Sequence, residues 1–360
     1  MDRYECYIYC IREEMWNKLG ENDFLADMSM ITAYFQRYKY FTPITAFYRV
    51  VDDKLIIGPY QGDPNLKASF EYGEGVCGTA WKEKRAIVVP DPSTTETSSP
   101  YSSCYKTELA VPVWKKGKII AILDICGNEG EDFNGENYDE LDIFYIQNIC
   151  NDLSCGIKPS LRDDLDSIAC KEYEDVYQFD EEYWEELRDR ALGIACRCDV
   201  DVVLVFALAA SYFRKYERGQ HIIGSDAAKA LREDEELREL LTEPQIDIIA
   251  QALEDQDLPE NQEPHTIYGK ILADSRHQLD SYTVLTGCIR SLREQYPDLD
   301  REALWDKFLS SLDERYGPGG TFKLWLQESY AVSRLEQLQK FIADRTTLRT
   351  DYDRLLPYYD

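Results

Sequence analysis

Residues 58–125 decide the fold of this chain, because short segments typical of strands and tight turns follow one another there in a fixed order. They are Gly58-Pro-Tyr-Gln-Gly62, Gly75-Val-Cys-Gly-Thr79, Val88-Val-Pro-Asp91, Glu108-Leu-Ala-Val-Pro112 and Ile122-Leu-Asp-Ile125. Apolar, β-branched runs favour strands, and glycines permit turns and a close approach of the backbone. This stretch therefore predicts a sheet with a glycine-containing segment beside a cysteine, Cys77.

The flanks of this stretch predict helices. Apolar residues recur at helical spacing over residues 5–40, with a break at Gly20-Glu-Asn-Asp23 where Asn22 or Asp23 is a suitable N-cap. Helix returns over residues 135–153. Between them we expect strands at 46–51 and 54–57 around an Asp52-Asp53 turn, and at 86–90, 109–114 and 119–125. The order predicts an α+β fold, an antiparallel sheet flanked by helices.

The second half of the chain predicts an all-α domain. Its periodic segments are 184–196, 200–214, 226–241, 243–254, 268–282, 283–295, 301–316 and 321–343. The shift in patterning predicts a first domain over residues 1–155, a linker over 156–174 marked by Pro159, and a helical domain over 175–360. A length of 360 residues suits two domains of ordinary size.

Composition excludes several classes of function. With 40 Lys+Arg against 68 Asp+Glu, the net charge of -28 disfavours nucleic acid and anionic membranes as partners. No apolar run reaches the ~20 residues of a membrane span, and the first residues lack the pattern of a signal peptide, so we expect a cytoplasmic protein. The 11 cysteines show no metal-like pairs; Cys196-Arg-Cys198 is spaced too tightly. Most are expected to be small buried hydrophobes, with no bound metal or cofactor.

Taken in their order, the segments of residues 58–125 resemble a GAF domain of the free methionine-R-sulfoxide reductase kind. The resemblance implies a pocket between the sheet and loops that fold over it. Glu108 and Asp124 fall on positions of the family's carboxylates, which grip the ligand's amine and supply a proton. The predicted ligand-binding residues are Phe47 and Tyr48, as an aromatic floor, with Tyr101, Glu108, Asp124 and Cys126.

The chain departs from this family at its nucleophile. Counting back from Glu108 by the family's spacing, the nucleophilic cysteine is replaced by Tyr101, and Cys104 lies nearby. Leu66 stands where the family has another cysteine, and Cys126 where it has a second aspartate. Two interpretations stay open. Either the pocket binds a small molecule without reduction, or Cys104 acts as the nucleophile with Cys77 or Cys126 as its partner.

The helical half resembles, less sharply, the HD-domain phosphohydrolases. Ala210-Ser211 stands where that family has its His-Asp pair, while Asp274 falls near its last metal position and His221 near an accessory histidine. Metal-assisted phosphate chemistry needs the complete ligand set, so the resemblance implies a degenerate, catalytically inactive HD-like domain. His221, His265 and His277 have a simpler interpretation as surface or capping residues.

Together these patterns predict a ligand-sensing or interaction protein, a signalling pseudoenzyme in which a GAF domain is joined to an inactive HD-like domain. The expected ligand is a small amine-bearing metabolite, and a homodimer through the GAF domain is a second expected partner. The alternative is an active free methionine-R-sulfoxide reductase.

Overall fold

The computed structural model describes residues 7–21, 23–37, 44–89, 107–127, 140–170, 181–216, 224–259, 261–327, 329 and 331–359. The chain divides into two compact units. Unit 1 comprises Met1–Ser167 with Ala195–Val203, and unit 2 comprises Ile168–Ile194 with Leu204–Asp360. No helix among the described residues is both long enough and apolar enough to cross a lipid bilayer.

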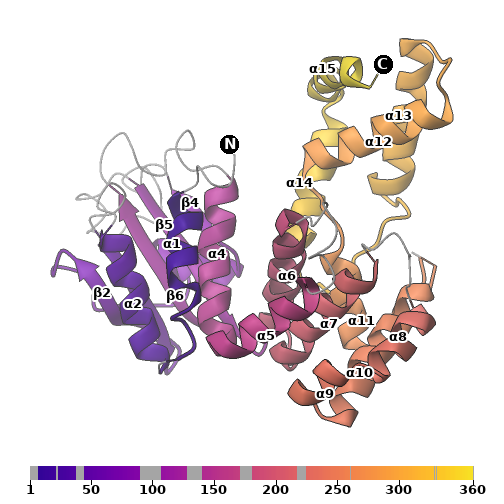
Figure 1. Cartoon of the computed structure of the whole chain (residues 1–360). Helices are drawn as coiled ribbons and strands as arrows, with labels where there is room; N and C mark the ends of the chain where they lie inside the picture. Colours follow the sequence, from indigo (N-terminus) through magenta and orange to yellow (C-terminus); the bar gives the residue numbers. More distant parts are fainter. Residues whose placement is uncertain are drawn as a thin grey trace. The chain divides into compact units, whose positions relative to one another are not determined.

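Unit 1 is built on a six-stranded antiparallel sheet of order β3-β2-β1-β6-β5-β4 (Figure 1). The strands are β1 (Ile44–Val51), β2 (Lys54–Gly62), β3 (Ser69–Phe70), β4 (Ile87–Val89), β5 (Thr107–Lys115) and β6 (Lys118–Gly127). Asp52 and Asp53 both have positive φ, 47° and 62°, which is the geometry of a tight turn between β1 and β2. The antiparallel sheet flanked by helices is therefore confirmed. Four of the predicted strands lie within longer ones, whereas the strand predicted at 86–90 corresponds to the shorter β4.

Helices α1 (Tyr7–Trp16), α2 (Phe24–Arg37) and α4 (Glu140–Cys155) cover one face of the sheet (Figure 1). Asp23 caps α2, because its carboxylate accepts hydrogen bonds from the backbone N–H groups of Leu25 and Ala26 at 2.9 and 3.0 Å. The core under these helices takes alternate residues of the strands, among them Leu109, Val111, Val113, Leu123 and Ile125.

The opposite face of the sheet carries helix α3 (Gly75–Glu83), which the sequence did not predict. Glycine-rich Gly75-Val-Cys-Gly begins this helix rather than a loop. Gly78 is required there, since a Cβ would lie 2.6 Å from the backbone oxygen of Glu71. Val76, Cys77 and Ala80 pack onto the sheet with the strand residues that face them.

Within the predicted linker, residues 159–170 form helix α5 (Pro159–Cys170). Pro159 stands at the first position of the helix, where its missing N–H costs no hydrogen bond, so it starts a helix here instead of breaking one. Arg162 of this helix is buried against Trp16 at the end of α1. Its guanidinium lies 4.7 Å from the indole centroid, and Nη1 donates to the Trp16 carbonyl oxygen at 2.8 Å.

Unit 2 is helical over most of its described residues, as predicted. Its helices are α6 (Glu181–Cys196, which ends in unit 1), α7 (Val202–Tyr216), α8 (Gly224–Arg232), α9 (Glu235–Leu240), α10 (Glu243–Glu254), α11 (Ile267–Ser275), α12 (Ser281–Gln295), α13 (Arg301–Tyr316), α14 (Ala331–Ala343) and α15 (Arg345–Leu355), with 3₁₀ turns at Asp255–Asp257 and Leu356–Tyr358. Aspartates cap several of them: Asp234, Asp280, Asp300 and Asp344 each accept from backbone N–H groups of the first turn.

Three predicted helix boundaries in unit 2 were wrong. The 226–241 segment is two helices, because the carboxylate of Asp234 starts a new one at α9. The first helix of the 268–282 segment ends at Ser275, and Asp280 is the N-cap of α12, which begins at Ser281. Residues 321–327 are not helical, and α14 begins only at Ala331. The first two errors follow from reading apolar spacing across a polar cap.

A buried ion pair fixes α1 against α4. Arg12 donates from Nε and Nη2 to the two carboxylate oxygens of Asp152, at 2.7 and 3.2 Å, and both side chains are at most 4% exposed. Removing one partner of such a pair leaves a charge in a dry environment. We expect Asp152→Ala to lower the free energy of unfolding by about 3–5 kcal/mol in urea titrations. The control Asp164→Ala, at an exposed position of α5, should change it by less than about 0.5 kcal/mol. Equal effects of the two substitutions would contradict the assignment.

Candidate functional site

The strand register brings the predicted carboxylates onto the face of the sheet that carries α3. Asp124 and Cys126 are alternate residues of β6, so they point to the same side. Cys126 pairs with Glu108 on β5, while Asp124 pairs with Ala110 on β5 and with Ala46 on β1. Because the neighbours of Asp124 on both sides are alanines, its carboxyl group has room above the sheet.

Helix α3 completes the cluster from above. The sulfur of Cys77 and one carboxyl oxygen each of Glu108 and Asp124 lie within 4.8 Å of one another. Cys126 Sγ donates to the two oxygens of Asp124 at 4.0 and 3.9 Å. Cys77, Asp124 and Cys126 are at most 5% exposed, and Glu108 keeps some exposed surface as a whole residue. We call Cys77, Glu108, Asp124 and Cys126 the acidic cluster.

Burial sets the protonation of the acidic cluster. Desolvation raises the pKa of Glu108 well above its usual range, and the adjacent Asp124, to which Glu108 donates a hydrogen bond, raises it further. Desolvation also raises the pKa of Asp124, opposed by hydrogen bonds from Cys77, Glu108 and Cys126. Two such carboxyl groups cannot both ionise cheaply, so near neutral pH the pair holds a proton. The thiols of Cys77 and Cys126 also have raised pKa values, from burial first and then from Asp124.

Tyr48 forms the aromatic side of this site. It is 1% exposed, and its hydroxyl donates to the carbonyl oxygen of Lys67 at 3.1 Å. Its ring meets Phe70 edge-on, with centroids 4.9 Å apart. Desolvation, followed by the negative charge of Asp124, raises the pKa of Tyr48. Tyr48 is therefore a neutral, rigid neighbour of the cluster.

Phe47 does not line the site, and this part of the prediction was wrong. It packs at 0% exposure into the helix-facing core, with Leu123 and Leu109. Consecutive strand residues point to opposite faces, so Phe47 and Tyr48 cannot both form one floor. Two other predicted residues, Tyr101 and Cys104, lie outside the described residues.

The sequence analysis missed the residues that shape the site without providing its chemistry. Ala46 and Ala110 flank Asp124, and Lys67 supplies the carbonyl that holds Tyr48. Small residues opposite a strand carboxylate are a usable signal, but only once the strand register is known. In chemical terms the site offers one sulfur and two oxygens to a cation. Among the described residues, Cys77, Glu108 and Asp124 also have the spacing that a bound metal ion would need.

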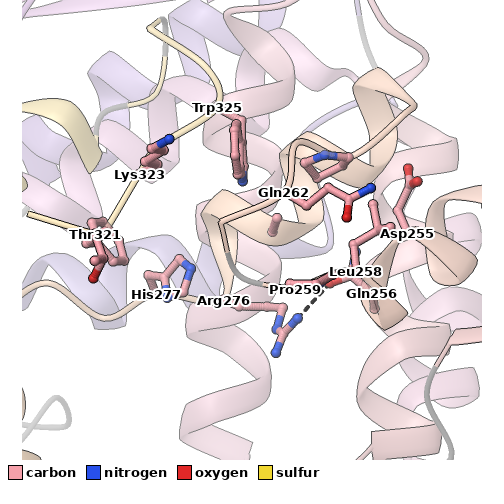
Figure 2. A pocket seen from close by; sticks show the side chains of 13 residues that line it. Asp255, Gln256, Leu258, Pro259, Gln262, Arg276, His277, Thr321, Lys323 and Trp325 are labelled. Atoms are coloured by element: carbon pink, nitrogen blue, oxygen red, sulfur yellow. Dashed lines mark hydrogen bonds between the residues drawn. The ribbon is translucent and has the colours of Figure 1, made fainter. Parts of the chain in front are cut away.

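A concave region lies in unit 2, with a volume of about 140 Å³ (Figure 2). Arg276 and His277 at the end of α11 line it, with Lys323 and Trp325 from the segment before α14. Arg276 donates to Gln256 Oε1 at 2.7 Å, the bond dashed in Figure 2. The acid on its wall, Asp255, accepts four hydrogen bonds from His265 and Thr266 between 2.7 and 3.1 Å.

Asp274, close to this pocket in the chain, has a structural role. Its Oδ1 accepts a hydrogen bond from the backbone N–H of Trp325, and its Oδ2 accepts one from the backbone N–H of Leu326, both at 3.0 Å. Burial raises its pKa to about 6, opposed by these two bonds. Asp274 thus lies within α11 and holds the segment before α14 through these backbone hydrogen bonds. His221 lies outside the described residues.

Comparison with known proteins agrees with the fold of unit 1. The family model for the GAF domain matches residues 32–154. GAF domain-containing protein A of Dictyostelium discoideum is 33% identical over 132 residues, 36% of this chain and 78% of that protein. Free methionine-R-sulfoxide reductase of Escherichia coli strain K12 is 30% identical over 127 residues, 35% of this chain and 75% of that protein.

Solved structures of similar sequence include free methionine-R-sulfoxide reductase from Neisseria meningitidis in complex with its substrate. It is 26% identical, with a TM-score of 0.37, over 44% of this chain and 89% of that one. A GAF sensor protein from Burkholderia vietnamiensis is 21% identical, with a TM-score of 0.39, over 43% of this chain and 94% of that one.

The raised pKa values of Glu108 and Asp124 predict a pH dependence of stability. The folded state binds their protons more tightly than the unfolded chain does. This contribution is therefore complete below the ordinary carboxyl pKa near 4 and is lost as the pH rises through the raised folded values. Between pH 5 and pH 8, urea titrations should show wild type losing more stability than the Glu108→Gln/Asp124→Asn double variant, by at least ~1 kcal/mol. Glu21→Gln, at an exposed position, serves as the control and should follow wild type. Parallel curves for wild type and double variant would show that the pair is not buried as described.

Proposed function

Because this chain belongs to the GAF domain family, we propose that its unit 1 is a ligand-sensing domain whose acidic cluster binds a small amine-bearing metabolite. The observation that carries the proposal is the convergence of Glu108 and Asp124 with Cys77 within 4.8 Å, on the face of the sheet opposite the covering helices α1, α2 and α4. Two carboxyl groups that merely capped strands would point apart toward water.

An ammonium group suits this cluster better than an anion does. The buried pair holds a proton because two unscreened negative charges are costly there. A cationic amine supplies the same compensation and donates hydrogen bonds to both carboxylates. Binding should therefore release a proton from the pair. The same charges disfavour phosphate, and the neutral Tyr48 offers an apolar wall for the rest of the ligand.

Free methionine and its sulfoxides are the first compounds to test, because similar proteins carry the name free methionine-R-sulfoxide reductase. Their ammonium group suits the charge of the acidic cluster. We propose ligand sensing and not reduction as the role of unit 1. GAF domain-containing protein A of Dictyostelium discoideum, which is similar to this chain, carries no reductase name.

Reduction by this chain is the alternative function, using Cys104 with Cys77 or Cys126. The protonation of the described thiols favours binding over reduction. Cys77 and Cys126 are buried beside a carboxyl group, which raises both pKa values and so disfavours the thiolate that attacks a sulfoxide. An active enzyme would depend on Cys104 to provide that thiolate.

For unit 2 we propose a non-catalytic, HD-like helical domain that acts as an interaction or output module. Ala210 and Ser211 are buried in α7, and the Ser211 hydroxyl donates to the Ala207 carbonyl at 2.7 Å. The Asp274 carboxylate is engaged by the backbone of Trp325 and Leu326. These interactions favour a structural role at positions where an HD phosphohydrolase would place metal ligands.

The first test is calorimetric titration of the full chain with free methionine and with each epimer of its sulfoxide. If the amine is held by the acidic cluster, Glu108→Gln or Asp124→Asn should each weaken binding at least about tenfold, because a charged hydrogen bond contributes roughly 1.5–3 kcal/mol. The amine-free analogue 3-(methylthio)propionate should not compete. Glu21→Gln is the matched control. Binding that is indifferent to both substitutions, or equal binding of the analogue, would refute the proposal.

The second test separates binding from reduction. We expect thioredoxin-coupled NADPH oxidation with free methionine-R-sulfoxide to show no turnover above the enzyme-free rate, because Cys77 and Cys126 are protonated at neutral pH. A reductase of the family serves as the positive control. Turnover that is abolished by Cys104→Ser would establish the alternative function.

A further inference from the structure

A pair of cysteines outside the acidic cluster has the geometry of a redox site. Cys155 is the last residue of α4 and Cys196 the last residue of α6, and their sulfur atoms lie 3.1 Å apart. Both residues belong to unit 1. A disulfide bond is about 2.05 Å long, so closing the remaining ~1 Å needs only a small movement of two side chains. We propose that Cys155 and Cys196 form a redox-active dithiol that exchanges with low-molecular-weight disulfides of the glutathione type.

The surroundings of Cys196 hold it in place for this exchange. Its carbonyl oxygen accepts from the backbone N–H of Gly117, in the turn between β5 and β6, at 3.2 Å. The next residue, Arg197, places its guanidinium 5.5 Å from the ring centroid of Trp114. These two contacts with the sheet hold the end of α6 beside the end of α4. The backbone therefore keeps the two sulfur atoms close to each other.

Hydrogen bonds divide the roles of the two thiols. Ser154 Oγ donates to Cys196 Sγ at 3.2 Å, and Cys155 is hydrogen-bonded to the same sulfur. The bond from Cys155, and then that from Ser154, lower the pKa of Cys196 although burial opposes them. The pKa of Cys155 is raised instead, first by its hydrogen bond to Cys196 and then by burial, and the pKa values of Cys77, Cys126, Cys150 and Cys288 are raised as well. The pair thus stabilises a single negative charge shared over two sulfurs.

Exposure sets the order of events. Cys196 is 2% exposed, whereas Cys155 keeps part of its surface accessible, so an external disulfide meets Cys155 first. The Cys155 thiol gives its proton to the Cys196 thiolate across the 3.1 Å contact, and the Cys155 thiolate so formed attacks one sulfur of oxidised glutathione. The glutathione S–S bond breaks, one glutathione thiolate leaves, and a mixed disulfide forms at Cys155.

The second step closes the protein disulfide. Cys196 gives its proton to the departing glutathione, and its thiolate attacks the Cys155 sulfur. The mixed disulfide breaks and the second glutathione leaves as a thiolate. In total the singly ionised pair loses two electrons and its one proton, and one glutathione disulfide becomes one glutathione thiol and one glutathione thiolate. The product joins the ends of two helices that are 41 residues apart in sequence.

The test uses the full-length protein at neutral pH, equilibrated with a series of ratios of reduced to oxidised glutathione, quenched with acid and alkylated. Over a narrow range of ratios, intact mass should show two fewer alkyl groups than in the fully reduced protein, and a loss of ~2 Da in a sample left unalkylated. Trypsin cleaves after Arg197 and so separates Cys196 from Cys198, and fragmentation then assigns the bond to Cys155 and Cys196. The oxidised wild type should also unfold at a higher urea concentration than the reduced form.

Variants distinguish the two roles. Cys196→Ser should stop the reaction at a mixed glutathione disulfide on Cys155, and Cys155→Ser should prevent any adduct at Cys196. Cys10→Ser and Cys288→Ser are controls and should form the bond as wild type does. The mapping of wild type decides the question even if a variant fails to fold. A pair that stays reduced in excess oxidised glutathione, or a disulfide that joins other cysteines, would overturn the proposal.

Discussion

The alternation of side chains along β1, β5 and β6 is the constraint on which unit 1 depends. In each strand, one set of residues supports the helices α1, α2 and α4, and the set between them faces α3. On β6, Leu123 and Ile125 belong to the first set, whereas Asp124 belongs to the second. A shift of register by one residue would bury the carboxyl group under the helices and expose the apolar core, so the core itself fixes where the acidic cluster lies.

The acidic cluster places two buried carboxyl groups on an otherwise apolar face of the sheet. The rest of that face is apolar, with residues such as Ile122, Tyr48 and Val76 packed around the cluster. Burying two carboxyl groups in this environment costs free energy unless they share a proton or meet a cation. The fold accepts this cost at one place, and such places are typical of binding sites. Cys126 adds no negative charge to the cluster, because its protonated thiol donates to Asp124.

The large acidic excess of the chain has a different meaning in unit 2. Several of its aspartates are structural acceptors: Asp280 and Asp300 start helices, and Asp255 and Asp274 hold neighbouring segments through backbone N–H groups. Burial raises the pKa of Asp255, but hydrogen bonds from His265 and Thr266 outweigh it and leave the pKa below its usual value. Part of the acidic excess therefore serves to begin helices, in addition to making the surface soluble.

The sequence by itself determined the α+β character of unit 1, the helical character of unit 2, and the carboxylates Glu108 and Asp124 as site candidates. These follow from local patterns of apolar spacing and from segments in a fixed order. Only the tertiary structure decided that Phe47 faces the helices while Tyr48 faces the site, and that Cys155 meets Cys196. The face of a strand and the meeting of two helix ends depend on register and packing between residues far apart in sequence, which no local pattern records.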